Sequence, residues 1–96
     1  MKPINIKKLE DCLDGSINFS YSFNIKVGEI LMRKLAEGGK LQYFPDFPKP
    51  FFKIVTAEGI HIKGIIGDDN FEVLYPRTGR DEKKRDFDAR LEKMLD

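Results

Sequence analysis

The sequence predicts a single α+β domain in which an antiparallel sheet of four to five strands carries two longer helices on one face. Three observations predict it: strict alternation of apolar and polar residues over 17–25, three β-rich runs separated by turn sequences over 51–75, and helical spacing of apolar residues near 26–37 and 81–95. At 96 residues, we expect one domain spanning residues 1–96.

Residues 3–13 fit two kinds of structure. Ile6, Leu9, Cys12 and Leu13 fall near one face of a helix, and Gly15 is a suitable residue to end it. Ile4 and Ile6 fit a short strand instead. The spacing favours a short helix, with a strand as the alternative.

Residues 17–25 carry the clearest periodic pattern in the chain. Five apolar side chains at odd-numbered positions, from Ile17 to Ile25, alternate with Asn or Ser. A helix would scatter these five side chains around its circumference. The pattern therefore predicts a strand with one buried and one solvated face.

The period then changes to that of a helix. Val27, Ile30, Leu31 and Leu35 lie on one helical stripe. Asn24 is a suitable N-cap, and the Gly-Gly pair at 38–39 is a suitable C-terminal exit. We predict a helix over about residues 26–37.

A short strand, a loop and a meander follow. Residues 41–44 fit a strand, and the three prolines within 45–50 predict a stiff surface loop because they exclude helix and central strand. Residues 51–56, 60–66 and 71–75 predict three strands, joined by hairpin turns at 57–59 and 67–70.

Residues 81–95 predict a last helix, whose apolar stripe contains Phe87, Leu91, Met94 and Leu95. The order of elements is compatible with a ferredoxin-like arrangement, a fold that hosts many unrelated functions and so carries no functional inference. The core we predict contains nine side chains from these elements: Phe19, Tyr21, Phe23, Ile30, Leu31, Ile54, Ile62, Val73 and Leu91.

Composition excludes several classes of function. The 17 basic and 16 acidic residues leave a net charge of +1, whereas a domain built for non-specific phosphate binding is usually strongly basic. One Cys and one His cannot supply a zinc site of three or four Cys/His ligands. We expect no metal and no cofactor. The unpaired cysteine and the lack of a long apolar run predict a cytoplasmic protein that does not cross a membrane.

The evidence for an enzyme is weak. Cys12 is the only thiol and His61 the only imidazole, and they fall in different predicted elements. A small core residue for Cys12 and an exposed strand residue for His61 are the favoured interpretations. No G-x-S-x-G, H-E-x-x-H or G-x-x-x-x-G-K-[ST] motif occurs. We therefore predict no catalytic residues.

The least ordinary segment is 43–52, in which five aromatic residues alternate with three prolines. Its rings either fold back onto the core or form a rigid apolar platform for a partner, with prolines that limit the entropy lost on binding. The platform interpretation names Tyr43, Phe44, Phe47 and Phe51 as partner-binding residues. It predicts a non-catalytic binding or adaptor module that recognises a protein partner or a second copy of itself as a homodimer.

Two alternatives stay open. A nucleic-acid-binding module would use the polar sheet face and the basic entry to the last helix, with phosphate contacts from these side chains: Lys53, Lys63, Arg77, Arg80 and Lys84. The acidic residues that dilute this cluster favour an ordinary solvated surface instead. A small enzyme or ligand carrier would need a pocket near the Pro/aromatic segment.

Overall fold

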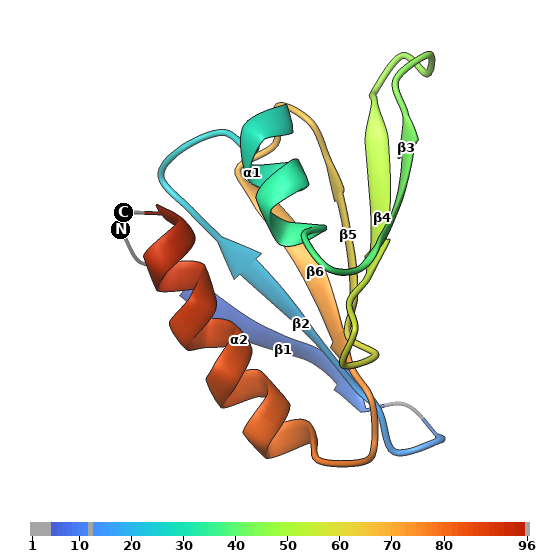
Figure 1. The fold of residues 1–96 in the computed structure, drawn as a ribbon, viewed down its shortest axis with the longest axis vertical. Coiled ribbons are helices and arrows are strands. Elements are labelled where there is room, and N and C mark those ends of the chain that lie inside the picture. The colour runs from blue at the N-terminus through green and yellow to red at the C-terminus, as the bar shows by residue number, and fades with distance from the viewer. Residues whose placement is uncertain (1–4, 12, 96) are drawn as a thin grey trace.

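In the computed structural model, which describes residues 5–11 and 13–95, six strands form one antiparallel sheet and two helices pack against it (Figure 1). The strand order is β1-β2-β6-β5-β4-β3. The elements are β1 (Asn5–Asp11), β2 (Ile17–Ser22), α1 (Glu29–Leu35), β3 (Lys40–Phe44), β4 (Phe51–Val55), β5 (His61–Ile65), β6 (Asn70–Tyr75) and α2 (Arg80–Leu95).

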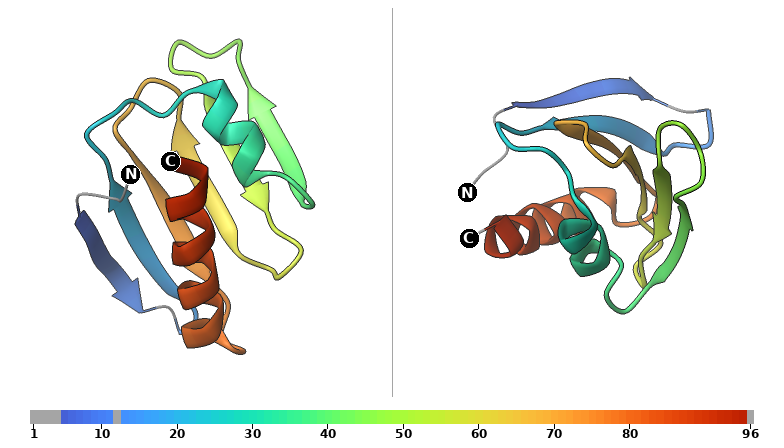
Figure 2. Two further views of the ribbon diagram at one scale, coloured as in Figure 1. Left: turned by 60° about the vertical axis from the view of Figure 1, so that its left-hand side comes forward. Right: turned by 90° about the horizontal axis from the view of Figure 1, so that it is seen from above.

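Connectivity explains this order. After the β1–β2 hairpin, the chain crosses one face of the sheet through α1 to the far edge, where β3 begins a meander that returns to β6 beside β2. Both helices lie on the same side of the sheet (Figure 2). The α+β class is confirmed, but a ferredoxin-like arrangement is not matched, because α2 follows the last strand instead of linking two strands.

The predicted helix over 3–13 is wrong, since residues 5–11 form strand β1. Every residue of β1 is exposed, so Ile6 and Leu9, on which the helix prediction depended, are not buried against the core. Its backbone pairs with β2 along the whole hairpin instead, with a bulge between Lys8 and Glu10. This strand raises the count from the predicted four or five to six. Cys12 lies outside the described residues.

The helix expected over 26–37 is confirmed in part and is shorter. It begins only after Gly28, whose extended backbone serves as N-cap without a side-chain bond, so Asn24 does not cap it. Val27 is not helical. Its amide donates to the Asp68 carbonyl (2.7 Å) and its carbonyl accepts from Gly67 (2.8 Å), which ties the segment before α1 to the β5–β6 turn.

The late start of α1 changes which of its side chains are buried. Met32 and Leu35 enter the core, whereas Ile30 in the first turn is 76 % exposed. The prediction that Ile30 belongs to the core is therefore wrong. Val27 is buried but is not part of the helix, so its burial does not indicate which face of α1 enters the core; within α1 the buried face is centred on Met32 and Leu35.

The remaining strands and α2 agree with the sequence pattern, except that the strand predicted over 17–25 ends at Ser22 and Ile25 is 39 % exposed. The buried face of the sheet carries the odd residues of β2 and β6 and the even residues of β4 and β5, as alternation requires. Six of the nine predicted core residues are buried, while Phe19 and Leu31 pack against the core half-buried. The buried hydrophobic set is Tyr21, Phe23, Val27, Met32, Leu35, Phe52, Ile54, Ile60, Ile62, Phe71, Val73, Tyr75, Phe87 and Leu91.

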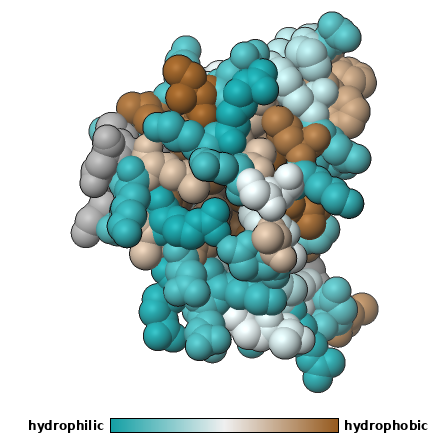
Figure 3. All heavy atoms as spheres, viewed as in Figure 1, coloured by the Kyte–Doolittle hydropathy of each residue, from teal (hydrophilic) through white to brown (hydrophobic). Residues whose placement is uncertain are grey.

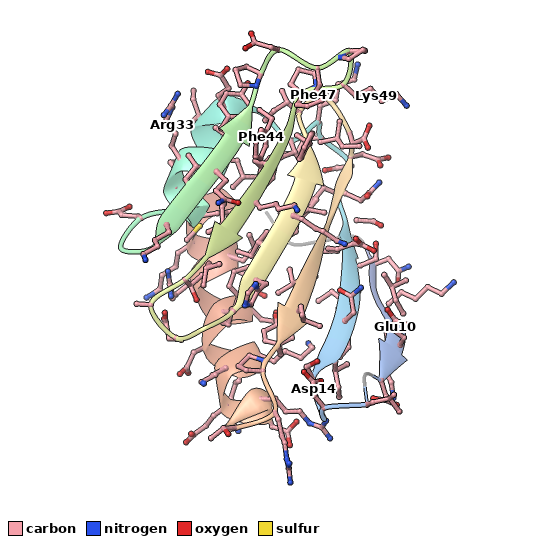
Figure 4. The ribbon with its side chains drawn as sticks, turned by 90° about the vertical axis from the view of Figure 1, so that its right-hand side faces the viewer. Glu10, Asp14, Arg33, Phe44, Phe47 and Lys49 are labelled. Atoms are coloured by element: carbon pink, nitrogen blue, oxygen red, sulfur yellow. The ribbon has the colours of Figure 1, made fainter. Side chains whose placement is uncertain are left out.

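The second face of the sheet is not covered by either helix (Figure 4). We call it the open face. Its strands point mostly polar side chains outward, among them Asn18, Gln42, Lys53, Lys63 and Glu72. Both helices pack against the opposite face of the sheet. A partner that binds the open face would therefore contact side chains of the strands directly.

Candidate functional site

Three phenylalanine rings form a cluster at the loop end of the β3–β4 hairpin. Phe44 and Phe51 are register partners, and their rings stack with centroids 4.6 Å apart and planes 21° apart. The Phe47 ring packs on both, at 5.2 Å from Phe51 and 6.1 Å from Phe44. We call these three residues the aromatic cluster; Figure 4 labels two of its members at one end of the sheet.

The aromatic segment divides between the two faces of the hairpin. Phe52 is fully buried and points to the helix side with the half-buried Tyr43, its register partner. Phe44 and Phe51 occupy the alternate positions and therefore belong to the open face, where they are half-buried. Phe47 in the loop is 52 % exposed. Core packing thus accounts for Phe52, whereas the aromatic cluster leaves apolar surface in contact with water.

The cluster is held on a stiff support. Three prolines restrict φ in the loop, and the Pro50 carbonyl accepts a hydrogen bond from the Ile66 amide (2.8 Å). On the other side of the hairpin, the Tyr43 hydroxyl donates to Glu29 Oε1 of α1 (2.8 Å). This hydrogen bond to a carboxylate raises the pKa of Tyr43. These bonds fix both ends of the loop to neighbouring elements, and the prolines restrict the backbone between them.

Two adjoining hollows lie on the open face below the cluster. One, of about 490 Å³, is lined by side chains that include Gln42, His61 and Leu74. The other, of about 440 Å³, reaches Phe51 of the aromatic cluster. Lys53, Lys63 and Glu72 line both hollows. The cluster and the hollows thus form one continuous surface of apolar, amide and charged groups.

Lys53 and Lys63 lie directly opposite each other on β4 and β5, as the predicted strand pairing requires. Like charges at such positions destabilise a sheet slightly. Lys63 has a counter-charge, since its Nζ lies 3.5 Å from Glu72 Oε2 on β6. Register also places Lys7 with Ser20 and Lys40 with Val55 on the open face. This face is therefore more basic than the nearly neutral chain.

The basic residues predicted at the entry to the last helix do not join this surface. Lys84 on α2 faces the helix side of the sheet, where its Nζ lies 5.0 Å from the centroid of the Phe19 ring. Arg80 donates to the Gly15 carbonyl (2.7 Å), and the aliphatic part of Arg77 also packs beside Gly15. Only Lys53 and Lys63 of the five predicted phosphate-binding residues therefore share one face.

Sequence reasoning missed a polar network under α2. The Tyr21 and Tyr75 hydroxyls hydrogen-bond to each other, and Tyr21 also donates to Asp88 Oδ1. The Lys84 ammonium donates to Asp88 Oδ2 (2.8 Å). Burial raises the pKa of both tyrosines. Two signals pointed to this network: tyrosines at buried strand positions need partners, and Lys84 and Asp88 are spaced for an ion pair on a helix.

Other chemistry is sparse in the described chain. His61 is exposed on the open face, and Cys12 lies outside the described residues, so their relative position is not described. Among residues 5–11 and 13–95, no group of three or more His, Cys, Asp or Glu side chains is placed to hold a metal ion. Within the same residues, neither helix is long and apolar enough to cross a membrane.

Comparison with known proteins identifies no relative: no family model matches the chain, and neither a curated protein nor a solved structure matches it. The class that the fold defines is therefore an α+β domain with a six-stranded antiparallel sheet and one open face. Its function has to be argued from the surfaces described above.

Proposed function

We propose that this chain is a non-catalytic binding module that recognises a protein partner through the aromatic cluster. The observation that carries the proposal is the position of Phe47, which is 52 % exposed yet packed on Phe44 and Phe51. A contiguous patch of exposed apolar surface marks an interaction site more often than a single exposed residue does.

The physical basis is the low cost of ordering this surface. Binding normally loses about 0.5–1.5 kcal/mol for each flexible side chain that is immobilised. Here, the ring contacts and the prolines already restrict the apolar groups that a partner would bury. Aromatic anchors surrounded by polar residues are typical of interface hot spots. A second copy of the chain is one such partner, which would make the module a homodimer.

The test uses photo-crosslinking from the cluster. We would replace Phe47 with p-benzoylphenylalanine, which keeps an aromatic side chain there, and place the same amino acid at the fully exposed Leu13 as a matched control. We expect a protein adduct from position 47 that is absent from position 13. The crosslinked protein, once purified, should bind the wild-type chain and lose at least tenfold in affinity for Phe47→Ala.

Equal adducts from both positions, or equal affinity of the purified partner for wild type and Phe47→Ala, would contradict the proposal. Sedimentation velocity of the chain alone distinguishes the homodimer. In that case, the association constant should fall in Phe47→Ala.

The lysines of the open face support a second candidate, a single-stranded nucleic-acid-binding module. Lys53 and Lys63 lie beside each other in both hollows, and the adjoining Phe51 belongs to the aromatic cluster. Lysines can contact phosphates while rings stack on bases. The partial neutralisation of this face by Glu10 and Glu72 makes it the weaker candidate.

A salt titration separates the two candidates. Fluorescence anisotropy with labelled 12-nucleotide RNA and DNA strands should show an affinity that falls steeply between 50 and 200 mM salt if phosphates are bound. The double variant Lys53→Gln/Lys63→Gln should reduce the slope of log affinity against log salt concentration by the amount expected for about two phosphate contacts. Arg85→Gln on α2 should leave this slope unchanged. No binding at 50 mM salt would exclude this candidate.

A further inference from the structure

A hydrophobic groove lies between the start of α1 and the end of α2, on the helix side of the sheet. A hollow of about 260 Å³ there is lined by apolar side chains from three segments, Ile25, Ile30, Leu31 and Met94. Ile30 is 76 % exposed and Ile25 is 39 % exposed. Hydrophobic side chains gather over the start of α1 and the loop before it (Figure 3).

Leu31 and Met94 also pack against the core, but core packing does not account for the exposed Ile25 and Ile30. Val27, Met32 and Leu35 already fill the core beneath α1. A single exposed isoleucine is common on protein surfaces, but here Ile25 and Ile30 line one hollow with two further apolar residues. Contiguous apolar surface of this kind is typical of an interface.

Among the described residues, the charged side chains that line the groove are Lys26 and Lys34, both basic. A second hollow, of about 390 Å³, continues from Lys34 and Met94 along α2 and adds Lys93 and Arg90, of which Arg90 is paired with Glu58 (2.7 Å). Glu37 is the acidic side chain on that continuation. The partner that complements this groove is therefore apolar in the middle and acidic along its flanks.

The walls of the groove limit the conformation of its occupant. They come from side chains of α1, α2 and the loop before α1, not from a strand edge. An extended peptide would find no row of backbone groups to pair with, whereas a helix satisfies its own backbone hydrogen bonds and can place an apolar face into the groove. An occupant with an apolar middle, acidic flanks and a helical backbone is an acidic amphipathic helix.

We propose that the groove formed by Ile25, Ile30, Leu31 and Met94 binds an acidic amphipathic helix of a protein partner, with Lys26 and Lys34 contacting its carboxylates. The aromatic cluster lies on the hairpin at the open face, so this site goes beyond the function proposed above. A module with both sites would hold two partners at once, as an adaptor does.

The test uses a fluorescein-labelled 18-residue helical peptide with leucines at i, i+3, i+4 and i+7 spacing and glutamates on its other positions. Its two controls are the same composition in scrambled order and the same leucine pattern with lysines in place of glutamates. By fluorescence anisotropy, we expect micromolar affinity for the acidic amphipathic peptide and at least tenfold weaker binding of both controls.

Variants locate the binding. Ile30→Asp and Lys34→Glu should each weaken binding of the acidic peptide at least fivefold, whereas Phe47→Ala, in the aromatic cluster, should leave it unchanged. Backbone amide chemical shifts of the ¹⁵N-labelled chain should change at residues 25–34 and near residue 94. Loss of binding in Phe47→Ala alone would assign the peptide to the aromatic cluster and overturn this proposal without affecting the first.

Other outcomes also overturn it. No shift change at residues 25–34 with 1 mM acidic peptide, or equal binding of the scrambled peptide, excludes an acidic helix. Binding to phosphatidylserine vesicles that Ile30→Asp abolishes, without peptide binding, would assign the groove to a membrane surface. Self-association that Ile30→Asp abolishes, also without peptide binding, would assign it to a second copy of the chain.

Discussion

The hydroxyl groups of Tyr21 and Tyr75 meet beneath α2 and hydrogen-bond to each other, although the two residues are 54 positions apart in the chain. Tyr21 also donates to Asp88, and a hydroxyl carries only one hydrogen. Tyr75 must therefore donate to the oxygen of Tyr21. The network runs in one direction, from Tyr75 through Tyr21 to the carboxylate, and it joins β6 and β2 to α2.

This direction predicts unequal effects of removing the two hydroxyls. Tyr21→Phe removes a hydrogen bond to a charged group and should lower the free energy of unfolding by about 1.5–3 kcal/mol. Tyr75→Phe leaves the bond between Tyr21 and Asp88 intact and should cost about 0.5–1.5 kcal/mol. Urea unfolding at pH 7 measures both, and equal losses would contradict the assigned direction.

The same pair predicts a loss of stability at alkaline pH. Burial raises the pKa of both hydroxyls above 10.0, because a buried phenolate would lose its solvation. The unfolded chain therefore releases these protons at lower pH than the native chain does. The contribution of the two hydroxyls to the free energy of unfolding is fully present below pH 10. As pH rises above 10, this contribution falls by about 1.4 kcal/mol per pH unit for each tyrosine.

Urea unfolding between pH 8 and 11.5 tests this dependence. The double variant Tyr21→Phe/Tyr75→Phe should lose the contribution of these two hydroxyls and retain the smaller one of Tyr43. Tyr43→Phe, which removes an exposed hydroxyl, should retain most of the dependence. A double variant that follows the wild-type pH curve would show that these hydroxyls do not carry it.

Substitutions in the aromatic segment should separate core from surface. Phe52→Ala removes a fully buried ring and should lower the free energy of unfolding by about 3–5 kcal/mol. Phe47→Ala removes a half-exposed ring and should cost less than about 1 kcal/mol. Chemical denaturation compares the two, and a loss above about 2 kcal/mol for Phe47→Ala would place that ring in the core.

A glycine on β5 is required by close packing. Gly64 is the register partner of Phe52 and of Phe71, and a Cβ there would lie 2.9 Å from an atom of each. Gly64→Ala should therefore cost about 1–3 kcal/mol. Gly28→Ala is the control for the added methyl group, since no atom lies within 4 Å of a Cβ there and its φ is −114°. Because Gly28 is the N-cap of α1, this control should still cost up to about 1 kcal/mol. Similar unfolding midpoints for both variants would contradict this packing.

The start of α1 predicts a third contrast. Ile30→Asp should change the free energy of unfolding by less than about 0.5 kcal/mol, because the side chain already faces solvent. Met32→Ala should cost about 2–5 kcal/mol, because Met32 is fully buried. A large loss of stability in Ile30→Asp would show that Ile30 belongs to the core. A small loss would show that Ile30→Asp folds normally and can be used to test the groove.

Local pattern alone determined much of this protein. Alternation over 17–25 and the turn sequences at 57–59 and 67–70 specified β2 and the meander, because a strand must separate its two faces at period two and a hairpin needs particular turn residues. The pairing of Lys53 with Lys63 followed from the meander. The segment of aromatic residues and prolines was also visible as the least ordinary in the chain.

Tertiary structure alone decided the rest. Residues 5–11 are a strand because β2 offers them a backbone partner, although their side chains stay exposed. Val27 is held by bonds to the β5–β6 turn and is not helical, so α1 buries Met32 and Leu35 and leaves Ile30 exposed. The division of the aromatic segment into a buried Phe52 and an exposed cluster depends on which face the helices cover. Hydrophobic pattern reports that a side chain prefers burial, but only the packing of distant elements decides whether it is buried in the core or left on the surface for a partner.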